Sequence, residues 1–242
     1  MSIHLVKLYP SLALAVAITL AAGDGQARPM RRPVGVVRGT VQFRGTPPVR
    51  APLRRDSDPV CARIEKLAED VVVTGGKLRD VHVRIKPGTL ASSFAGSFTP
   101  AEITQTECMY TPRVVGVMIG EGVMIRNGDP TYHNVHGSVG TRTLWNLSQP
   151  AAAPEIMRTD LGKAGDVVSL RCDVHAWMQA YVVITDHPFF DVTEADGVFE
   201  LRGVPPGTYE LEAWHPTLGL RTTRITVGKG KAVPPVTFTF GP

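Results

Sequence analysis

Short apolar runs separated by Gly, Pro, Asn and Asp recur along most of the chain, and their lengths are typical of strands. The clearest runs lie at residues 36–43, 70–73, 81–85, 114–119, 123–125, 167–170 and 181–185. The best helix candidate is residues 59–69, because Asp58-Pro59 is a helix-start signal. The pattern therefore predicts an all-β fold with sandwich or barrel topology.

The pattern changes after residue 188, where apolar and polar residues alternate on both sides of a Pro-Pro-Gly turn at 205–207. Further strands are expected at residues 220–227 and 236–240. Residues 196–211 read D-G-x-F-x-L-x-G-V-P-P-G-T-Y-x-L, which resembles the carboxypeptidase regulatory-like domain. The resemblance implies a small transthyretin-like β-sandwich at residues 188–242.

That family begins with a strand of the form G-x-V-x-x-x-G, and residues 39–45 match it. The segment 188–242 is shorter than such a domain usually is. Our hypothesis is therefore that the N-terminal β strands, residues 36–90, complete the C-terminal sandwich. A second β domain, residues 100–187, would then be inserted between strands of the first.

The N-terminal segment has the pattern of a secretory signal peptide over residues 1–27. Lys7 precedes an apolar run at residues 8–22, and the small residues of Gly25-Gln26-Ala27 suit a cleavage point. The run is shorter than the roughly 20 apolar residues that a membrane span needs. We expect a periplasmic or secreted protein with no stable membrane span in the mature chain, and a retained N-terminal anchor is the alternative.

Composition allows one sizeable core or two modest ones in 242 residues of which 43% are hydrophobic, and two small β domains fit better. The net charge of +4 is too small to make nucleic acid the expected partner. Arginines cluster near the start of the mature chain. Residues 28–35 are expected to be a basic flexible segment, either simply solvated or steering the protein toward an acidic partner.

The strongest chemical motif follows the strand at residues 167–170. Cys172, His175 and Met178 have the spacing C-x2-H-x2-M, so that one loop supplies a thiol, an imidazole and a thioether. One thiolate, two imidazoles and a weak thioether are the donors that suit copper cycling between two oxidation states. The motif therefore predicts one copper ion, Cu(I) or Cu(II), with Cys172, His175 and Met178 among its ligands.

The missing imidazole is expected from the segment His133-Asn134-Val135-His136. If this segment is extended, His133 shares a face with apolar Val135, while Asn134 and His136 point the other way. His133 is therefore the predicted ligand. Asn134 could hydrogen-bond to the loop that carries Cys172 and so support the site. His136 stays open as an alternative ligand or a surface residue near the site.

The two motifs together resemble the cupredoxins, and amicyanin most closely, because most other members have a longer loop between the His and the Met. The resemblance covers about residues 100–187 and implies a Greek-key barrel or sandwich. It also implies a type 1 (blue) copper site with equatorial His133, Cys172 and His175 and axial Met178. Asp173-Val174 departs from the usual Thr-Pro of the family, and a carboxylate directed at the metal would lower the reduction potential.

The three cysteines are an odd number for an exported protein. Because the metal motif takes Cys172, Cys61 and Cys108 are left as a plausible disulfide in an oxidising compartment. The alternative is that all three are small buried apolar residues.

Other interpretations of the metal motif fit its residues less well. Structural zinc normally takes four Cys or His ligands, and type c haem needs C-x-x-C-H, which is absent from the sequence. The residues could also be ordinary members of the core. Catalysis is not expected, because four protein ligands leave no open position for a substrate.

We therefore expect an exported one-electron carrier that exchanges electrons with a redox protein such as a cytochrome or a periplasmic oxidoreductase. The exposed edge of His175 is the expected exit for the electron. The alternatives are a periplasmic copper carrier or storage protein, and a cell-surface binding module with structural copper.

Overall fold

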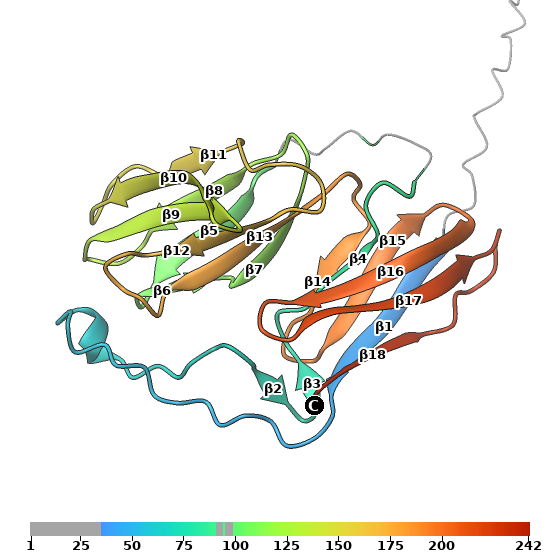
Figure 1. The fold of residues 1–242 in the computed structure, drawn as a ribbon, viewed down its shortest axis with the longest axis horizontal. Coiled ribbons are helices and arrows are strands. Elements are labelled where there is room, and N and C mark those ends of the chain that lie inside the picture. The colour runs from blue at the N-terminus through green and yellow to red at the C-terminus, as the bar shows by residue number, and fades with distance from the viewer. Residues whose placement is uncertain (1–34, 91–93, 95–98) are drawn as a thin grey trace, which may run out of the picture. The chain divides into compact units, whose positions relative to one another are not determined.

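The computed structural model describes residues 35–90, 94 and 99–242. The predicted signal peptide and nearly all of the basic segment lie outside these residues. Nearly all regular structure in the described part is β-strand, arranged as two sandwiches with separate apolar cores. The prediction of an all-β fold is therefore confirmed (Figure 1).

The first sandwich is built from residues 101–185. One sheet has the order β10 (Arg142–Gln149), β9 (His133–Val139), β12 (Val167–Arg171), β13 (Gln179–Thr185), β7 (Val114–Met118). The facing sheet has the order β11 (Ile156–Arg158), β8 (Val123–Asn127), β5 (Ala101–Thr106), β6 (Met109–Thr111). Alternate residues of the two sheets fill one core, whose fully buried members include Ile103, Ile125, Val135, Leu170 and Val182.

The second sandwich joins the two ends of the described chain. One sheet contains β15 (Val198–Val204), β1 (Gly35–Phe43), β3 (Lys77–Leu78) and β2 (Val73–Thr74), with β18 (Val236–Phe240) also paired to β1. The other has the order β14 (Phe190–Val192), β4 (His82–Ile85), β16 (Gly207–His215), β17 (Gly219–Val227). Their core contains Phe199, Leu201, Leu211, Phe238 and Phe240.

Strand pairing places two N-terminal strands among C-terminal ones. β1 pairs antiparallel with β15 and parallel with β18, and β4 pairs antiparallel with β14 and β16. The whole of the first sandwich lies in the sequence between β4 and β14. These are the pairings that an insertion of one β domain into another requires.

The prediction of a helix at residues 59–69 is wrong. The structure has a single 3-10 turn there, η1 (Cys61–Arg63), followed by extended Ile64. The start signal was real, because the Asp58 carboxylate accepts hydrogen bonds from the backbone of Val60 and Cys61. The segment cannot continue as a helix, because its backbone pairs at Leu53 with Lys66 and its Cys61 is bonded to a distant strand turn.

In the part of the chain that the structure describes, no helix combines the length and the apolar character needed to cross a membrane.

The close packing of β1 gives a first testable prediction. A β-carbon on Gly39 would overlap the backbone oxygen of Val236 and the ring of Phe199. We therefore expect Gly39→Ala to lower the free energy of unfolding by about 1–3 kcal/mol, the usual cost of overpacking a core. The neighbouring Arg38→Ala, which removes an exposed ion pair with Glu200, should cost less than about 1 kcal/mol. Urea unfolding of both variants checks this, and equal stabilities would contradict it.

Candidate metal centre

The candidate metal centre lies where the start of β9 meets the loop between β12 and β13. β9 pairs with β12, with Arg171 opposite His136, so that His133 at the start of β9 lies beside the residues that follow β12. Cys172 is the first of these and Met178 is the last residue before β13. Hydrogen bonds from Met178 N to His175 O (2.9 Å) and from Cys172 N to Met178 O (3.4 Å) close the loop.

The donor atoms of three predicted ligands converge. The Nδ1 atoms of His133 and His175 are 2.9 Å apart, and the Cys172 sulfur is 3.7 Å from His175 Nδ1. The ligand atoms of these three residues all lie within 4.8 Å of one another, and the side chains are buried. Met178 is also fully buried and belongs to the same core cluster as Cys172.

The donors fit a metal ion better than they fit an ordinary core. Two imidazole nitrogens that face each other can form a hydrogen bond only if one of them carries a hydrogen. One metal ion, in contrast, can accept the lone pairs of both. A thiol beside two imidazoles is moreover a soft donor set of the kind that copper prefers. The structure therefore brings together the side chains that the sequence singled out.

The far nitrogen of each histidine contacts a carboxylate. His133 Nε2 is 3.0 Å from Asp129 Oδ2, and His175 Nε2 is 3.1 Å from Asp58 Oδ2. An ionised carboxylate only accepts hydrogen bonds, so each Nε2 carries the hydrogen and each Nδ1 is left free as a metal donor. Two carboxylate–histidine pairs thus point their free nitrogens at the same place.

The environment shifts the protonation of the cluster. Burial opposes the charged form of His133, but its hydrogen bond to Asp129 and its proximity to Cys172 outweigh burial and raise its pKa. Burial likewise opposes the Cys172 thiolate, yet His133 and backbone N–H groups stabilise it and lower the pKa of the thiol. The site therefore favours the deprotonated sulfur that binds metals.

Electrostatics differ at the second histidine. Burial, together with the nearby His133, lowers the pKa of His175. Burial also opposes ionisation of its partner Asp58, but hydrogen bonds from Thr131 and from the backbone of Cys61 and Val60 outweigh that cost and bring the pKa of Asp58 to about 2. Asp58 is therefore a carboxylate at neutral pH, and His175 presents a neutral ring.

Asn134 connects β9 to the metal loop. Its side-chain oxygen accepts the backbone N–H of Asp173, and its Nδ2 donates to Asp173 Oδ2 (3.1 Å) and Asn146 Oδ1 (2.6 Å). His136 does not join the cluster of donors, because its two nitrogens contact Asp173 Oδ1 and Thr143 Oγ1 instead. The Asp173 carboxylate is held by these outer residues and is half exposed, so it does not point at the metal position.

The expectation that an edge of His175 is exposed is wrong. His175 is only 3% exposed, because a segment from outside the first sandwich covers it. We call residues 51–68 the cap loop. Its ends are joined by the Pro52–Leu67 bridge and by backbone hydrogen bonds from Leu53 to Lys66 and from Ala68 to Ala51, and its tip carries η1 (Figure 1).

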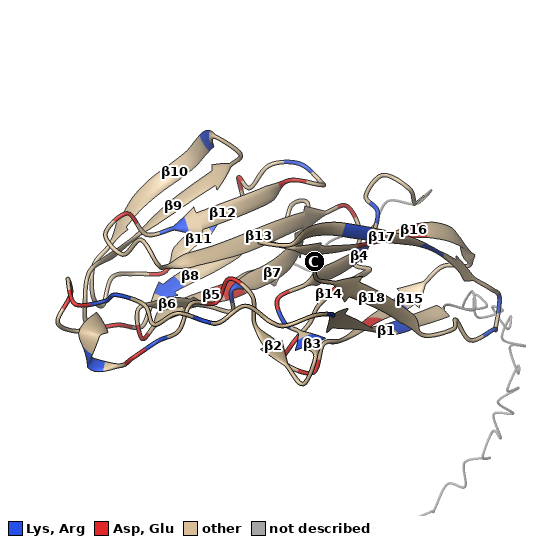
Figure 2. Cartoon of the chain, turned by 60° about the horizontal axis from the view of Figure 1, so that its bottom comes forward, with Lys and Arg blue, Asp and Glu red and all other residues tan. Residues whose placement is uncertain are grey.

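The cap loop is fixed to the first sandwich by several contacts. Cys61 and Cys108 form a disulfide with a Cα–Cα distance of 5.6 Å, which is the pairing that the cysteine count predicted. The buried Arg55 donates to the backbone oxygens of Ile64 and Glu107, and its guanidinium lies 5.8 Å from the centroid of the Trp177 ring. Charged positions of both signs line the loop (Figure 2). Of its acidic residues, Asp58 is the one that contacts a histidine of the cluster.

Two residues of the centre were missed by the sequence reasoning, namely Asp58 and Asp129. Asp58 was recognised as a start signal, which explains one of its oxygens but not the other. Asp129 lies four residues before His133, within the sequence Asn-Gly-Asp-Pro, to which the sequence analysis assigned no role. The four-residue spacing was the one available signal, since Asp58 is 117 residues from its histidine.

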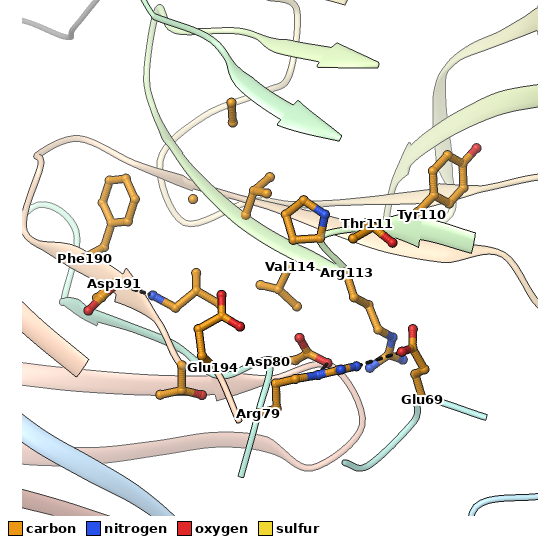
Figure 3. Close-up of a pocket in the computed structure, with 16 residues that line it drawn as sticks. Glu69, Arg79, Asp80, Tyr110, Thr111, Arg113, Val114, Phe190, Asp191 and Glu194 are labelled. Carbon is orange, nitrogen blue, oxygen red and sulfur yellow. Dashed lines mark hydrogen bonds and ion pairs between the residues drawn. The ribbon is translucent and has the colours of Figure 1, made fainter. Parts of the chain in front are cut away.

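A cavity of about 530 Å³ lies apart from the four predicted ligands, none of which lines it (Figure 3). Some of its charged groups form ion pairs, and the partner of Arg113 lies outside the residues that line the cavity. Arg79 contacts Glu69 (2.9 Å) and Asp80 (3.1 Å), as Figure 3 shows, and Arg113 lies 3.7 Å from Asp70. This cavity offers no cluster of metal donors within the described residues.

No protein-family model matches the chain, and no curated protein does so. Among solved structures, a purple cupredoxin from Nitrosopumilus maritimus is 17% identical and aligns over 35% of this chain and 99% of its own, with a TM-score of 0.28. Amicyanin from Paracoccus versutus is 17% identical over 48% of this chain and 97% of its own, with a TM-score of 0.31. A copper-containing nitrite reductase from Thermus scotoductus SA-01 is 17% identical over 57% of this chain and 28% of its own, with a TM-score of 0.31.

The contacts of Asn134 give a second prediction. Asn134→Ala removes the acceptor for Asp173 N from a buried position, so we expect it to lower the free energy of unfolding by about 1–3 kcal/mol. Asn146→Ala removes an exposed partner of the same network and should cost less. Thermal unfolding of the metal-free protein compares the two, and a larger loss in Asn146→Ala would contradict the assignment.

Proposed function

We propose that this protein binds one copper ion through His133, Cys172, His175 and Met178 and acts as an exported one-electron carrier. The observation that carries the proposal is the convergence of the Cys172 sulfur and two Nδ1 atoms in a buried position, beside a loop that ends in a buried methionine. Copper in this ligand set would supply reversible one-electron chemistry between Cu(II) and Cu(I).

The donor set favours copper over zinc. Structural zinc normally takes four Cys or His ligands. The cluster offers three such residues, and the fourth proposed ligand is the thioether of Met178. The other two groups of donors nearby each include Cys61 or Cys108, whose sulfurs are joined in the disulfide. We therefore propose a single metal position with trigonal thiolate and imidazole ligands and a weak axial methionine.

The protein residues around the position support electron transfer. β9 and β12 fix His133 and Cys172 on neighbouring strands, and the hydrogen-bonded loop fixes His175 and Met178. Burial of all four side chains keeps water away, so the same ligands can serve both oxidation states with little rearrangement. Four protein ligands leave no open position for a substrate, which supports a carrier and not a catalyst.

The partner proposed for the carrier is a redox protein such as a cytochrome or a periplasmic oxidoreductase, met in the periplasm or outside the cell. The disulfide supports an oxidising compartment. We also propose that residues 188–242, with β1 and β4, form a carboxypeptidase regulatory-like module that carries the metal domain between its strands.

A copper carrier or storage protein is the second candidate, and one observation favours it. His175, whose edge would be the exit for an electron, lies beneath the cap loop, so the metal position is enclosed on that side. An enclosed metal position would release copper slowly. Copper transferred to an acceptor apoprotein would favour this role, whereas fast reversible reduction with the metal retained would favour electron transfer.

The third prediction tests the metal itself. The purified chain, given one equivalent of Cu(II), should develop an intense visible absorption from thiolate-to-copper charge transfer. Cys172→Ser should lose this absorption entirely, because its hydroxyl oxygen cannot provide the transition. Cys61 and Cys108 are unchanged in this variant, so a thiolate-to-copper band that persists cannot come from Cys172. Absence of the band in the wild-type chain would reject the proposed site.

The fourth prediction concerns the axial ligand. Met178→Leu keeps the buried volume nearly unchanged but removes the thioether. We expect the variant to retain the copper–thiolate absorption and to have a higher reduction potential, because loss of a donor disfavours Cu(II) more than Cu(I). Protein-film voltammetry measures the potential. A potential equal to that of the wild type would exclude Met178 as a ligand.

A further inference from the structure

Both histidines of the cluster are held from behind by the same arrangement. Each Nε2 contacts one carboxylate, Asp129 for His133 and Asp58 for His175, at 3.0 and 3.1 Å. Asp129 is 7% exposed and Asp58 is partly buried, so neither contact is a loose surface pair. The two carboxylates come from segments that are about seventy residues apart in the sequence.

Each carboxylate is in turn held by the backbone of a disulfide cysteine. Asp129 accepts hydrogen bonds from Glu107 N (2.7 Å) and Cys108 N (2.9 Å), and Asp58 accepts them from Val60 N (2.7 Å) and Cys61 N (3.2 Å). The Cys61–Cys108 bond therefore joins the two turns that orient the two carboxylates. The disulfide, the carboxylates and the histidines form one connected frame.

The turn at Cys108 shows how strongly this frame is constrained. Glu107 and Cys108 form the two-residue connection between β5 and β6, and both have positive φ angles of 54° and 53°. Residues other than Gly, Asn or Asp adopt this conformation only at a cost in free energy. In return, both N–H groups of the turn point at one carboxylate, so Asp129 is fixed beside His133.

We propose that Asp58 and Asp129 are positioning residues of the metal centre and that the cap loop, tied down by the Cys61–Cys108 disulfide, is an integral part of that centre. This inference rests on the proposed function, since it concerns the same copper position. It assigns a role to a segment that lies outside the β domain resembling the cupredoxins.

The physical effect of the two carboxylates follows from their contacts. By accepting the Nε2 hydrogen, each one selects the ring form whose Nδ1 is free, and it increases the electron density that Nδ1 donates. A stronger nitrogen donor stabilises Cu(II) more than Cu(I). The frame should therefore raise affinity for Cu(II) and lower the reduction potential of the site.

Asp58 has a further consequence, because it also covers its histidine. Its Oδ2 accepts from Thr131 (2.8 Å) as well as contacting His175, while Cys61 Sγ lies 3.7 Å from His175 Nε2. The edge of His175 thus meets a carboxylate and a sulfur of the cap loop. A partner that draws electrons from His175 would have to contact the cap loop and not the ring itself.

The experiment compares Asp58→Asn and Asp129→Asn with the wild type. Removal of such a partner typically costs about 10–100-fold in metal affinity. We expect a loss of this size for Cu(II), measured by competition with a chelator, and a smaller loss for Cu(I). A tenfold difference between the two losses corresponds to a rise of about 59 mV in reduction potential.

Asp173→Asn is the matched control, because it removes the same charge from the residue next to Cys172. The Asp173 oxygens contact His136, Asn134 and Asn146, none of which is a proposed ligand. We expect its affinity loss to be less than a third of that in the other two variants. Equal losses in all three would show a general effect of charge and would overturn the positioning role.

A readout on the metal-free protein separates this inference from the proposed function. Nitrogen-15 NMR of the imidazoles should show both His133 and His175 with hydrogen on Nε2, and each Asp→Asn change should disturb its own histidine. Failure of wild-type protein to bind copper would reject the proposed function while the NMR result still decides the positioning role. Copper binding with unchanged affinity, potential and NMR signals in both variants would overturn the inference alone.

The double variant Cys61→Ser/Cys108→Ser tests the part played by the disulfide. We expect weaker Cu(II) binding and a change at His175 that exceeds the change at His133, since Asp129 keeps its contacts within the β5–β6 turn while Asp58 depends on the cap loop. A Cu(II) affinity and an imidazole spectrum identical to those of the wild type would show that the disulfide only stabilises the fold.

Discussion

The pairing of β9 with β12 is the interaction on which the proposed metal centre depends. It sets His133, the first residue of β9, beside the loop that begins at Cys172, and the register between Arg171 and His136 decides which face of each strand looks inward. A slip of one residue would turn His133 outward and bring Asn134 in, because side chains alternate along a strand. The apolar residues Val135 and Leu170 hold this register, since both are fully buried in the core below.

Because the candidate centre is buried, the ring nitrogens of its histidines need polar partners. Four ring nitrogens lie in or next to a closed region, and each must meet a donor, an acceptor or a metal, because an unpaired buried polar group is costly. The Nδ1 atoms face one another, and the Nε2 atoms meet Asp129 and Asp58. Those carboxylates are satisfied by the backbone of two turns, which the disulfide links. Hydrogen bonds therefore connect the buried histidines, through the two carboxylates, to the cap loop.

The extent to which the sequence predicted this structure follows from how local each feature is. Cys172, His175 and Met178 lie on one loop, so their spacing predicted that they would be close together. Alternation along one strand predicted that His133 would face the core, where it is fully buried. The strands β5 and β10 were not predicted. In β5 Gln105 is fully buried and pairs with Gln149 of β10 at 2.8 Å, so the pattern of apolar residues misses both strands. The contact between Asp58 and His175 spans 117 residues, and no pattern along the chain reports it.

The path of the chain explains why the cap loop is available to the centre. It lies between β1 and β4, two strands of the second sandwich, while the first sandwich lies between β4 and β14. A segment that belongs to the enclosing sandwich in sequence is thereby bonded covalently to the enclosed one at Cys108. Its removal would leave His175 without its acceptor and expose the ring, so residues 100–187 cut out alone would lack one side of the proposed site. For this chain, the unit that would form the proposed metal centre is therefore larger than the β domain that carries the proposed ligands.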